Sequence, residues 1–446
     1  MNNLNIPETN QPRIVIIGCG FAGLNLAKNL KKQPYQVVMI DKHNYHTFQP
    51  LLYQVATAGL EPDSIAYPIR NIFKKQKNFF FRMAEAHSVD TESQIINTNI
   101  GPLSYDYLVI ATGSATNYFG MERVEKLAIP MKSVPEALNL RSLILQNFEA
   151  ASLTENLKER ERLMNFVIVG AGPTGTELAG ALAELKTHVL PNDYPDLDFR
   201  RMSIHLIEMA DKVLPPMSDF SSKNALEYLE SLGVQVWLNT AVQDYDGEMV
   251  KTNQKKKLPA STLIWAAGVS GALIDGFAQG EDFAKGRYLV NKLNQIGQHK
   301  NVFAIGDVAS MLSDENPKGH PMLAQVAIQQ GENLAANLAR EAKKKEWKAF
   351  TYNDMGSMAT VGRNKAVAEL YNKFMLKGFA GWYVWMMVHL ISLVGFRNRL
   401  VVLLNWFINY FSYDRKIRLI IRPVNRHSLA EKELALESHK EALNQD

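Results

Sequence analysis

Three glycines near the start of the chain have a spacing that suits a dinucleotide phosphate. Gly18, Gly20 and Gly23 follow the β-branched run 14–17 in G-x-G-x-x-G order. In this pattern the first glycine permits a tight turn, the second lets a pyrophosphate approach the backbone, and the third lets the next helix pack against the strand. Asp41 ends the following apolar run, 18 residues after Gly23, where an acid can hold ribose hydroxyls. The glycines in this context predict a nucleotide site.

The same fingerprint occurs a second time. Gly170, Gly172 and Gly175 repeat the spacing 152 residues further along the chain. A later strand ends in Glu208, and no arginine follows it directly, a pattern that prefers NAD over its 2′-phosphorylated form. Two nucleotide units in one chain imply two dinucleotides bound face to face, so that electrons can pass from one to the other.

Other chemistry-bearing residues follow predicted strands. A strand and a small-residue turn close each unit, at 107–113 and at 262–268. A third buried run is expected to end at Gly306, and Asp307 comes next. The Asp307 carboxylate suits a ribityl hydroxyl, but an aspartate after a strand is also a common helix N-cap, and one side chain can do both.

Glutamines open an Ala- and Leu-rich helix expected between His320 and Arg340. They are Gln325, Gln329 and Gln330. A glutamine amide is uncharged and both donates and accepts, which suits a neutral carbonyl-bearing substrate near a flavin. Solvated helix glutamines would have the same spacing, so both interpretations stay open.

Composition narrows the function classes. A chain of 446 residues is too long for one core and suggests two or three domains, and a net charge of +4 does not argue for a nucleic-acid partner. The single cysteine, Cys19, excludes an intramolecular disulfide and the dithiol flavoenzymes, and it disfavours sulfide oxidation. We interpret Cys19 as a small buried residue rather than a reactive thiol. The first 11 residues lack signal-peptide features, and we expect a cytoplasmic protein.

Two segments between the motifs have distinct compositions. Residues 42–60 mix aromatic side chains with His43, His46 and Pro50, which indicates a structured loop against a ligand; metal binding by the two histidines is a weaker alternative. The Pro- and Asp-rich extension 185–200 lengthens the second unit. We expect the helix to continue past Leu185 and then to give way to a loop.

The last hundred residues change character. Two runs, 379–394 and 400–411, are apolar nearly all round, and neither reaches the roughly 18 residues of a membrane-spanning helix. With their tryptophans and tyrosines they predict a pair of monotopic helices on an anionic membrane, with a hydrophobic dimer interface as the alternative. The expected flanking cations are Arg397, Arg399, Arg415, Lys416, Arg418, Arg422 and Arg426, against one acid, Asp414.

Taken together, these residues make the chain similar to the type II NADH:quinone dehydrogenases, the single-subunit flavoproteins that do not pump protons. Glycine fingerprints alone would also fit ferredoxin reductases, but the AQxAxQ segment combined with aromatic C-terminal helices is more specific. The resemblance covers nearly the whole chain and rests on NYHTFQPLLYQVATAGL (44–60), GAGPTGTELAG (170–180), AQVAIQ (324–329), GSMATVGRNKAV (356–367) and GFRNR (395–399).

The resemblance implies an α/β fold with two Rossmann-like domains, one for FAD and one for NADH, and a C-terminal helical segment for membrane association. The implied boundaries are 1–118 and 269–345 for the FAD domain, 119–268 for the NADH domain and 346–446 for the C-terminal domain.

The resemblance also implies functional residues, and no metal site. The implied FAD contacts are Gly18, Gly20, Phe21, Ala22, Gly23, Asp41, Lys42, Thr112, Gly113, Gly306, Asp307, Ala324 and Gln325. The implied NADH contacts are Gly170, Gly172, Thr174, Gly175, Glu208 and Gly268. Gln325 and Gln329 would border the quinone head group, and Lys377 is a weaker match to a basic residue near it. Glu177 would lie near the nicotinamide and flavin and relay protons, although a glutamate at a helix start is also favoured by the helix dipole.

The function that follows is transfer of two electrons from NADH through FAD to menaquinone or ubiquinone, as part of respiratory electron transport. The expected partners are an anionic membrane surface and a second copy of the chain, with no nucleic acid. The expected location is the cytoplasmic face of the inner cell membrane. Two alternatives are a soluble NAD(P)H-dependent reductase of a protein acceptor and a redox-sensing NAD–flavin binding protein.

Overall fold

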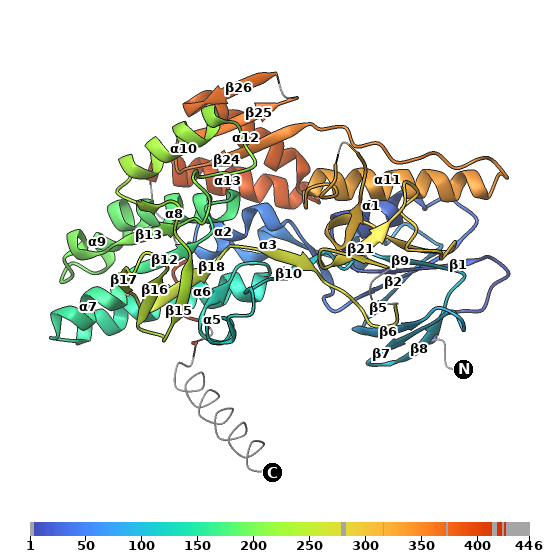
Figure 1. Cartoon of the computed structure of the whole chain (residues 1–446), viewed down its shortest axis with the longest axis horizontal. Coiled ribbons are helices and arrows are strands. Elements are labelled where there is room, and N and C mark those ends of the chain that lie inside the picture. Colours follow the sequence, from blue (N-terminus) through green and yellow to red (C-terminus); the bar gives the residue numbers. More distant parts are fainter. Residues whose placement is uncertain are drawn as a thin grey trace, which may run out of the picture. The chain divides into compact units, whose positions relative to one another are not determined.

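The computed structural model describes residues 4–277, 282–314, 316–371, 373–412, 417–421 and 423–424. The chain divides into two compact units (Figure 1). Unit 1 comprises Met1–Thr47, Ala66–Ala115 and Val269–Asp354. Unit 2 comprises Phe48–Ile65, Thr116–Gly268 and Met355–Asp446.

Unit 1 is built on a parallel five-stranded sheet with strand order β22-β9-β1-β2-β5. Its central strand β1 is buried at every position, which explains its continuous β-branched run. The strands are β22 (Val302–Ala304), β9 (Tyr107–Ile110), β1 (Arg13–Ile17), β2 (Gln36–Asp41) and β5 (Phe79–Met83). Helices α1 (Phe21–Asn29) and α11 (Ala324–Glu341) lie side by side in this unit (Figure 1).

Smaller elements complete unit 1. The pairs and sheets are antiparallel β3-β4, antiparallel β6-β7-β8, and mixed β20-β21-β23. Their bounds are β3 (Tyr45–Thr47), β4 (Ala66–Pro68), β6 (Ala86–Asp90), β7 (Ile95–Thr98), β8 (Gly101–Ser104), β20 (Phe283–Ala284), β21 (Arg287–Val290) and β23 (Ala309–Met311), with α4 (Ile69–Ile72) and the 3₁₀ turn η4 (Gly306–Val308). The strands β10 (Ser114–Thr116) and β19 (Val269–Gly271) lie where the chain passes between units.

Unit 2 repeats the parallel arrangement as β11-β18-β12-β13-β14. An antiparallel sheet β15-β16-β17 accompanies it, as β6-β7-β8 does in unit 1. The strands are β11 (Ile129–Pro130), β18 (Thr262–Trp265), β12 (Phe166–Val169), β13 (Ile204–Ile207), β14 (Gln235–Trp237), β15 (Val242–Tyr245), β16 (Met249–Thr252) and β17 (Lys257–Pro259). The helices are η1 (Gln49–Leu51), α2 (Leu52–Ala56), α3 (Pro62–Ile65), α5 (Glu122–Leu127), α6 (Val134–Leu153), α7 (Leu157–Met164), α8 (Pro173–Glu184) and α10 (Asp219–Ser231).

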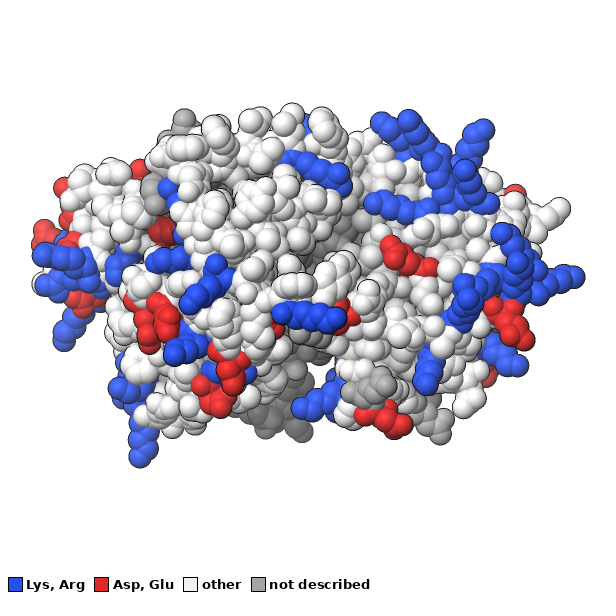
Figure 2. All heavy atoms as spheres, turned by 90° about the horizontal axis from the view of Figure 1, so that it is seen from above, with Lys and Arg blue, Asp and Glu red and all other residues white. Residues whose placement is uncertain are grey.

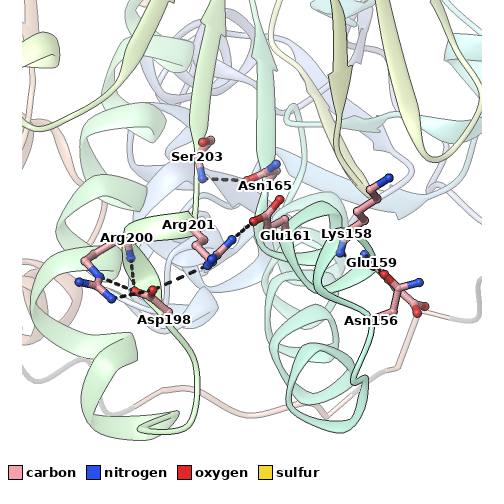
Figure 3. A network of polar contacts seen from close by, with 9 residues as sticks. All are labelled: Asn156, Lys158, Glu159, Glu161, Asn165, Asp198, Arg200, Arg201 and Ser203. Carbon is pink, nitrogen blue, oxygen red and sulfur yellow. Dashed lines mark hydrogen bonds and ion pairs between the residues drawn. The ribbon is translucent and has the colours of Figure 1, made fainter.

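The extension after α8 continues the helix, as predicted. A π-helical turn η2 (Leu185–Val189) leads into the short α9 (Leu190–Asp193), and the 3₁₀ turn η3 (Phe199–Arg201) ends the insertion. Figure 3 shows how that end is held at α7: Asp198 caps η3 and pairs with Arg200 and Arg201, and Arg201 donates to Glu161 of α7. In the same network Asn156 caps α7 through the amides of Lys158 and Glu159, and Ser203 N donates to Asn165 Oδ1 at 2.8 Å. These exposed pairs position the extension at a modest energetic gain.

The C-terminal part of unit 2 is a three-stranded antiparallel sheet followed by two helices. The elements are β24 (Gly356–Thr360), β25 (Ala366–Leu370), β26 (Phe374–Lys377), α12 (Gly378–Ser392) and α13 (Phe396–Ser412). Among the described residues, no helix has the length and hydropathy that crossing a membrane requires. The predicted cations Arg415, Lys416, Arg422 and Arg426, and Asp414, lie outside the described residues.

One sequence expectation about local structure is wrong. Residues 42–60 are mostly regular: they contain β3, η1 and α2 rather than a loop. Pro50 lies in the first turn of η1, where proline is tolerated, and the buried Leu51, Leu52 and Val55 follow it in η1 and α2.

Candidate functional site

The first glycine turn has the shape that a pyrophosphate needs. A Cβ on Gly18 would lie 2.3 Å from the Ala111 carbonyl oxygen, and a Cβ on Gly23 would lie 2.0 Å from the Gly18 carbonyl oxygen. Gly20 is different, because a Cβ there would meet nothing within 4 Å. The outer two glycines are therefore required by packing, and the middle one borders open space at the N-terminus of α1. Phe21 and Ala22 begin that helix.

The Asp41 carboxylate is held by two backbone amides, one from the first glycine turn and one from the residues just after Asp41. Cys19 N donates to Asp41 Oδ2 at 2.6 Å and His43 N donates to Oδ1 at 2.7 Å. Burial raises the pKa of this carboxyl, and the two amides oppose the rise. Lys42 is exposed beside it. Cys19 itself is buried and its thiol pKa is well above the usual value, mainly through desolvation, so the interpretation as a small packed residue fits and a reactive thiolate does not.

His46 adds an unused acceptor next to the turn. Its Nδ1 donates to the Cys19 carbonyl at 2.7 Å, and its buried Nε2 has no hydrogen-bond partner among the described residues. Burial lowers the pKa of His46 to about 4, so the ring is neutral and Nε2 carries a lone pair. A buried orphan acceptor fits a site that is completed by a bound hydroxyl-bearing cofactor. His43 instead stacks on Tyr45, and the described residues contain no cluster that could hold a metal ion.

Gly306 and Asp307 lie close to the first glycine turn, because a Cβ on Gly306 would lie 3.2 Å from Ala22 Cβ of α1. Asp307 Oδ2 accepts a hydrogen bond from Ser114 Oγ at 2.7 Å. The N-cap interpretation of Asp307 is wrong, because Ile305 occupies that position and β22 ends at Ala304, two residues before Gly306. Nearby, Thr112 Oγ1 donates to the Ala272 carbonyl at 2.6 Å, and Gly113 has a positive φ of 74° with open space at its Cα.

The glutamines of α11 have different partners. Gln330 is 1% exposed, and its Oε1 accepts from Gly306 N at 2.7 Å, so it shapes the turn before Asp307. Gln329 pairs with the backbone of Asn353: Nε2 donates to the carbonyl and Oε1 accepts from the amide, each at 2.9 Å. Ala324 and Gln325 are half-buried in the first turn of α11.

The second glycine turn repeats the first. A Cβ on Gly170 would lie 2.8 Å from Ala267 N, and a Cβ on Gly175 would lie 1.9 Å from the Gly170 carbonyl oxygen. A Cβ on Gly172 would meet nothing within 4 Å. Thr174 is exposed in the first turn of α8 beside that space.

Glu208 is anchored as Asp41 is. Ala171 N donates to Oε2 at 2.7 Å and Ala210 N donates to Oε1 at 2.9 Å. Gly268 is exposed at the end of the second unit's closing turn, and a Cβ there would lie 2.4 Å from the Phe119 ring. Both glycine turns therefore fit a dinucleotide, with an acid already oriented for its ribose.

A cavity of about 110 Å³ lies within unit 2, away from the glycine turn of α8. Its walls come from α2, α8, α12, α13 and the β24–β25 connection, and they are mainly aromatic and small. The lining residues are Tyr53, Gln54, Thr57, Gly59, Glu177, Ala181, Glu184, Val189, Thr360, Gly362, Arg363, Trp382, Trp385, Met386, Trp406, Asn409 and Tyr410.

Glu177 is the buried one of the two acids, Glu177 and Glu184, on the wall of this cavity. It is 5% exposed, and burial raises its pKa to about 8, although hydrogen bonds from Thr360 N and Trp385 Nε1 lower it. At neutral pH the side chain is therefore mostly protonated and can donate. The helix-dipole interpretation is wrong, because no acid lies in the first turn of α8 and Glu177 comes after that turn.

Lys377 lies elsewhere in unit 2. It is exposed at the N-cap of α12, its Nζ donates to Asn224 Oδ1 at 3.0 Å, and it lies over the Phe220 ring. Lys377 is not among the residues that line the cavity at Glu177. Gln325 and Gln329 belong to unit 1, and Glu177 and Lys377 to unit 2.

Sequence reasoning missed the residues around Glu177. Thr360 and Trp385 contact its carboxyl, and Tyr53, Gln54 and Thr57 line the cavity from α2. The available signal was in the quoted segments 44–60 and 356–367, whose polar residues interrupt apolar runs. No periodicity brings three segments so distant in sequence onto one carboxyl.

Comparisons with known proteins agree with this geometry. The family model for pyridine nucleotide-disulphide oxidoreductases matches residues 12–331, and the model for the NDH2 C-terminal domain matches residues 355–413. A type II NADH:quinone oxidoreductase of Mycobacterium tuberculosis is 36% identical over 423 residues, which cover 90% of this chain and 89% of the relative. The chain belongs to the type II NADH:quinone oxidoreductases.

Other relatives and structures of type II NADH:quinone oxidoreductases extend the match. An internal alternative NAD(P)H-ubiquinone oxidoreductase of Solanum tuberosum is 30% identical and covers 89% of this chain and 86% of its own. The structure of Plasmodium falciparum NDH2 in complex with NADH superposes with a TM-score of 0.84 at 23% identity, covering 93% of this chain and 100% of the other. Membership confirms the predicted family, the two-dinucleotide α/β fold class and an FAD-dependent NADH:quinone oxidoreductase.

Proposed function

We propose that unit 1 binds FAD, that the glycine turn of unit 2 binds NADH, and that the quinone enters the aromatic cavity at Glu177. Family membership gives the overall reaction, the transfer of two electrons from NADH to a quinone without proton pumping. Bound FAD supplies the two-electron redox chemistry. The observation that carries the assignment of the acceptor site is a buried acid, with a pKa raised by burial, on the wall of an aromatic cavity.

The stoichiometry of the reaction gives Glu177 its role. Reduction of a quinone to a quinol takes up two electrons and two protons, and the hydride of NADH accounts for the electrons and one proton. One further proton must reach a quinone oxygen in each turnover. Glu177 holds a proton near neutral pH and lines the cavity, so we assign that transfer to it, with reprotonation from solvent.

Replacement of Glu177 by glutamine tests this role. Glu177→Gln keeps the shape and removes the titrating proton, so we expect quinone reduction to slow by at least about tenfold, within the usual range for a proton-transfer group. Flavin content and the rate of flavin reduction by NADH are expected to stay unchanged. Glu184→Gln makes the same change on the same helix and cavity wall and is expected to keep the pH profile. Normal quinone turnover in Glu177→Gln would remove the residue from the scheme.

We also propose that α12 and α13 lie on an anionic membrane. The polar face of α13 points into unit 2: Asn398 donates to the Asp63 carbonyl, Asn405 to Glu61 Oε2, and Trp406 to Gln54 Oε1. The outward face is apolar, with large exposed side chains at Phe379, Tyr383, Ile391, Phe396, Leu400, Leu403, Leu404, Phe407, Ile408 and Phe411. Figure 2 is seen from the side on which Figure 1 labels β26 and α12, and it shows uncharged surface between separate lysines and arginines. A helix with a polar inside and an apolar outside is typical of an interfacial anchor, and the exposed Arg397 and Arg399 favour an anionic surface.

Point substitutions test the membrane surface better than removal of α12, which would also take Trp385 from Glu177. We expect Phe407→Asp with Phe411→Asp to abolish co-sedimentation with vesicles that contain phosphatidylglycerol. Reduction of a small soluble acceptor is expected to persist. Leu153→Asp, which is 86% exposed on α6 in the wild type, is the matched control and is expected to keep vesicle binding. Unchanged binding of the double variant, together with a change in sedimentation coefficient, would assign the face to a dimer instead.

The remaining proposals concern assembly and location. We propose a homodimer at the cytoplasmic face of the cell membrane, where NADH is available. Cross-linking of membrane-bound protein tests the dimer, and oxidation of externally added NADH by inverted but not right-side-out vesicles tests the face.

A further inference from the structure

Helix α12 reaches the buried carboxyl through one side chain. Trp385 is 2% exposed, and its indole Nε1 donates to Glu177 Oε1 at 3.1 Å. The Thr360 amide, at the end of β24, donates to the same oxygen at 3.4 Å. Because both donors end on Oε1, that oxygen is held as an acceptor. Oε2 is then the oxygen that can carry the proton.

The indole is itself fixed from behind. The His389 ring stacks on Trp385 with centroids 4.2 Å apart, and His389 Nδ1 donates to the Trp385 carbonyl at 2.7 Å. Phe48 meets His389 edge-on with centroids 6.0 Å apart. Burial lowers the pKa of His389 to about 4, so this ring is neutral at working pH and acts by packing. The His389 ring is held by the Trp385 carbonyl and by Phe48. Because this fixed ring stacks on the indole, Trp385 has little freedom to turn its N–H away from Glu177.

We propose that Trp385 is a positioning residue for proton transfer: its indole N–H fixes Oε1 of Glu177 as acceptor and thereby presents the Oε2 proton to the bound quinone. The inference rests on the proposed role of Glu177 as proton donor. In the step, the Oε2–H bond breaks, an O–H bond forms on the quinone, and Glu177 is left as a carboxylate until solvent reprotonates it. The two electrons come from NADH by the reaction of the family.

The ionised product of that step also needs Trp385. An indole N–H bonded to a carboxylate is a charge-assisted hydrogen bond, which is stronger than the bond to the neutral acid. Removal of the donor therefore raises the apparent pKa of Glu177 and slows loss of its proton. The other titratable or charged groups that face the cavity are Glu184 of α8, Arg363 after β24, Tyr53 of α2, Tyr410 of α13, and His389 behind the indole. Arg363 is already engaged, with its amide on Glu184 Oε1 and its guanidinium on the Asn409 carbonyl.

Helix α12 connects the exposed apolar surface of unit 2 with Glu177. The helix that carries Trp385 also carries the exposed Phe379, Tyr383 and Ile391. The same fifteen-residue helix therefore has one side chain on the catalytic acid and an apolar face for the membrane. A shift of α12 would change the hydrogen bond to Glu177, so membrane contact and proton donation share one element.

Trp385→Phe tests the proposal in the full-length, FAD-loaded enzyme. The change keeps an aromatic ring for His389 and removes the N–H donor together with the second ring of the indole, and the control Trp406→Phe makes the same loss of volume in the same cavity. We expect the alkaline limb of quinone reduction to move up by about half to one pH unit and kcat to fall about five- to twentyfold, with flavin reduction by NADH unchanged. Trp385→His restores a ring N–H and is expected to return the limb toward the wild-type position.

Trp406→Phe is the matched control. This tryptophan lines the same cavity and also donates through its indole, but to Gln54 Oε1. It is expected to alter the quinone KM without moving the pH limb. If Trp385→Phe and Trp406→Phe have the same pH profile, the proposal is wrong even when Glu177→Gln is slow. If Glu177→Gln is not slow, the role of Glu177 itself is wrong.

An infrared measurement covers the case in which Trp385→Phe folds poorly. The carbonyl stretch of protonated Glu177 is assigned as the band that Glu177→Gln removes from the wild-type spectrum. We expect its frequency to be that of an acid whose carbonyl accepts hydrogen bonds, to rise in Trp385→Phe, which lacks the donor, and to return toward the wild-type value in Trp385→His. A wild-type band at the frequency of a free carboxylic acid would contradict the proposal without any change at Trp385.

Discussion

The two dinucleotide units use one scaffold and differ in what covers the phosphate-binding helix. In unit 1, α11 crosses α1 so closely that a Cβ on Gly331 would lie 2.5 Å from the Ala22 carbonyl oxygen. In unit 2, the end of β24 takes this place on α8, where a Cβ on Gly180 would lie 3.0 Å from the Val361 carbonyl carbon. A glycine allows the close approach in both units.

The element packed on the phosphate-binding helix brings different side chains to it in the two units. Helix α11 brings Gln330 to the amide of Gly306 and so shapes the turn before Asp307. Strand β24 brings Thr360, and α12 behind it brings Trp385, to Glu177. The repeated scaffold therefore provides the glycine turn and its acid in each unit. The covering element decides whether the unit supports a cofactor turn or an acceptor cavity.

The largest expected effect comes from the third glycine of each turn. Gly23→Ala and Gly175→Ala would place Cβ about 2 Å from a backbone oxygen, and we expect each to destabilise its unit by more than about 3 kcal/mol, as over-packing of a rigid contact does. Thermal unfolding measures the loss. Gly20→Ala and Gly172→Ala meet open space and are expected to cost less than about 1 kcal/mol while weakening dinucleotide binding. Equal losses of stability at the second and third glycines would contradict the division of roles.

The next largest effect is the pH dependence of stability that Glu177 gives to unit 2. Glu177 has a pKa of about 8 in the folded protein, above the ordinary carboxyl value, so the folded state keeps a proton that the unfolded state has lost over the range between these values. The free energy of unfolding therefore falls as pH rises toward 8, by up to about 1.4 kcal/mol per pH unit from this group. Glu177→Gln removes the contribution.

Chemical denaturation of wild type and Glu177→Gln at pH 5 and pH 8 measures the difference. We expect the variant to gain stability relative to the wild type as pH rises. Glu184→Gln, on the same helix, is the control and is expected to follow the wild type. A constant difference between Glu177→Gln and the wild type across this range would show that Glu177 is already ionised at pH 5.

Substitution of the two acids beside the glycine turns is expected to have a smaller effect. Asp41 and Glu208 each accept two backbone amides, one of them from the residue between the first two glycines of the turn. We expect Glu208→Ala to raise the NADH KM about tenfold, equivalent to about 1.4 kcal/mol, and to leave flavin content intact. Asp41→Ala is expected to lower flavin content, read from the absorbance of purified protein, with no separate effect on NADH binding. Loss of flavin in both variants would mean that the units are not independent.

The sequence was most informative where one segment decides the geometry. Both glycine turns, with Asp41 and Glu208, could be predicted because each strand, turn and helix start lies within a short stretch whose packing requires glycine at set positions. Cys19 could be interpreted as a packed residue for the same reason.

The environment of Glu177 could not be predicted in this way. Its carboxyl lies on α8, but its pKa depends on burial and on donors that come about 180 and 210 residues later in the chain. Asp307 is a second example, because its partner Ser114 lies on a strand 193 residues earlier in the chain. The N-cap position expected for Asp307 is occupied by Ile305. Local spacing fixes the type of residue, and the partners come from tertiary packing.

The smallest effect distinguishes two glutamines on one helix of unit 1. Gln329 pairs with both backbone groups of Asn353, whereas Gln325 lies in the first turn of α11. We expect Gln329→Ala to loosen the segment before residue 354 at a cost of about 1 kcal/mol, because a paired backbone amide and carbonyl lose their partners. Gln325→Ala is the matched control on the same helix and is expected to leave both stability and exchange at the Asn353 amide unchanged. Thermal unfolding and hydrogen exchange at the Asn353 amide measure the two effects. Equal exchange at Asn353 in the two variants would show that the Gln329 side chain does not hold this segment.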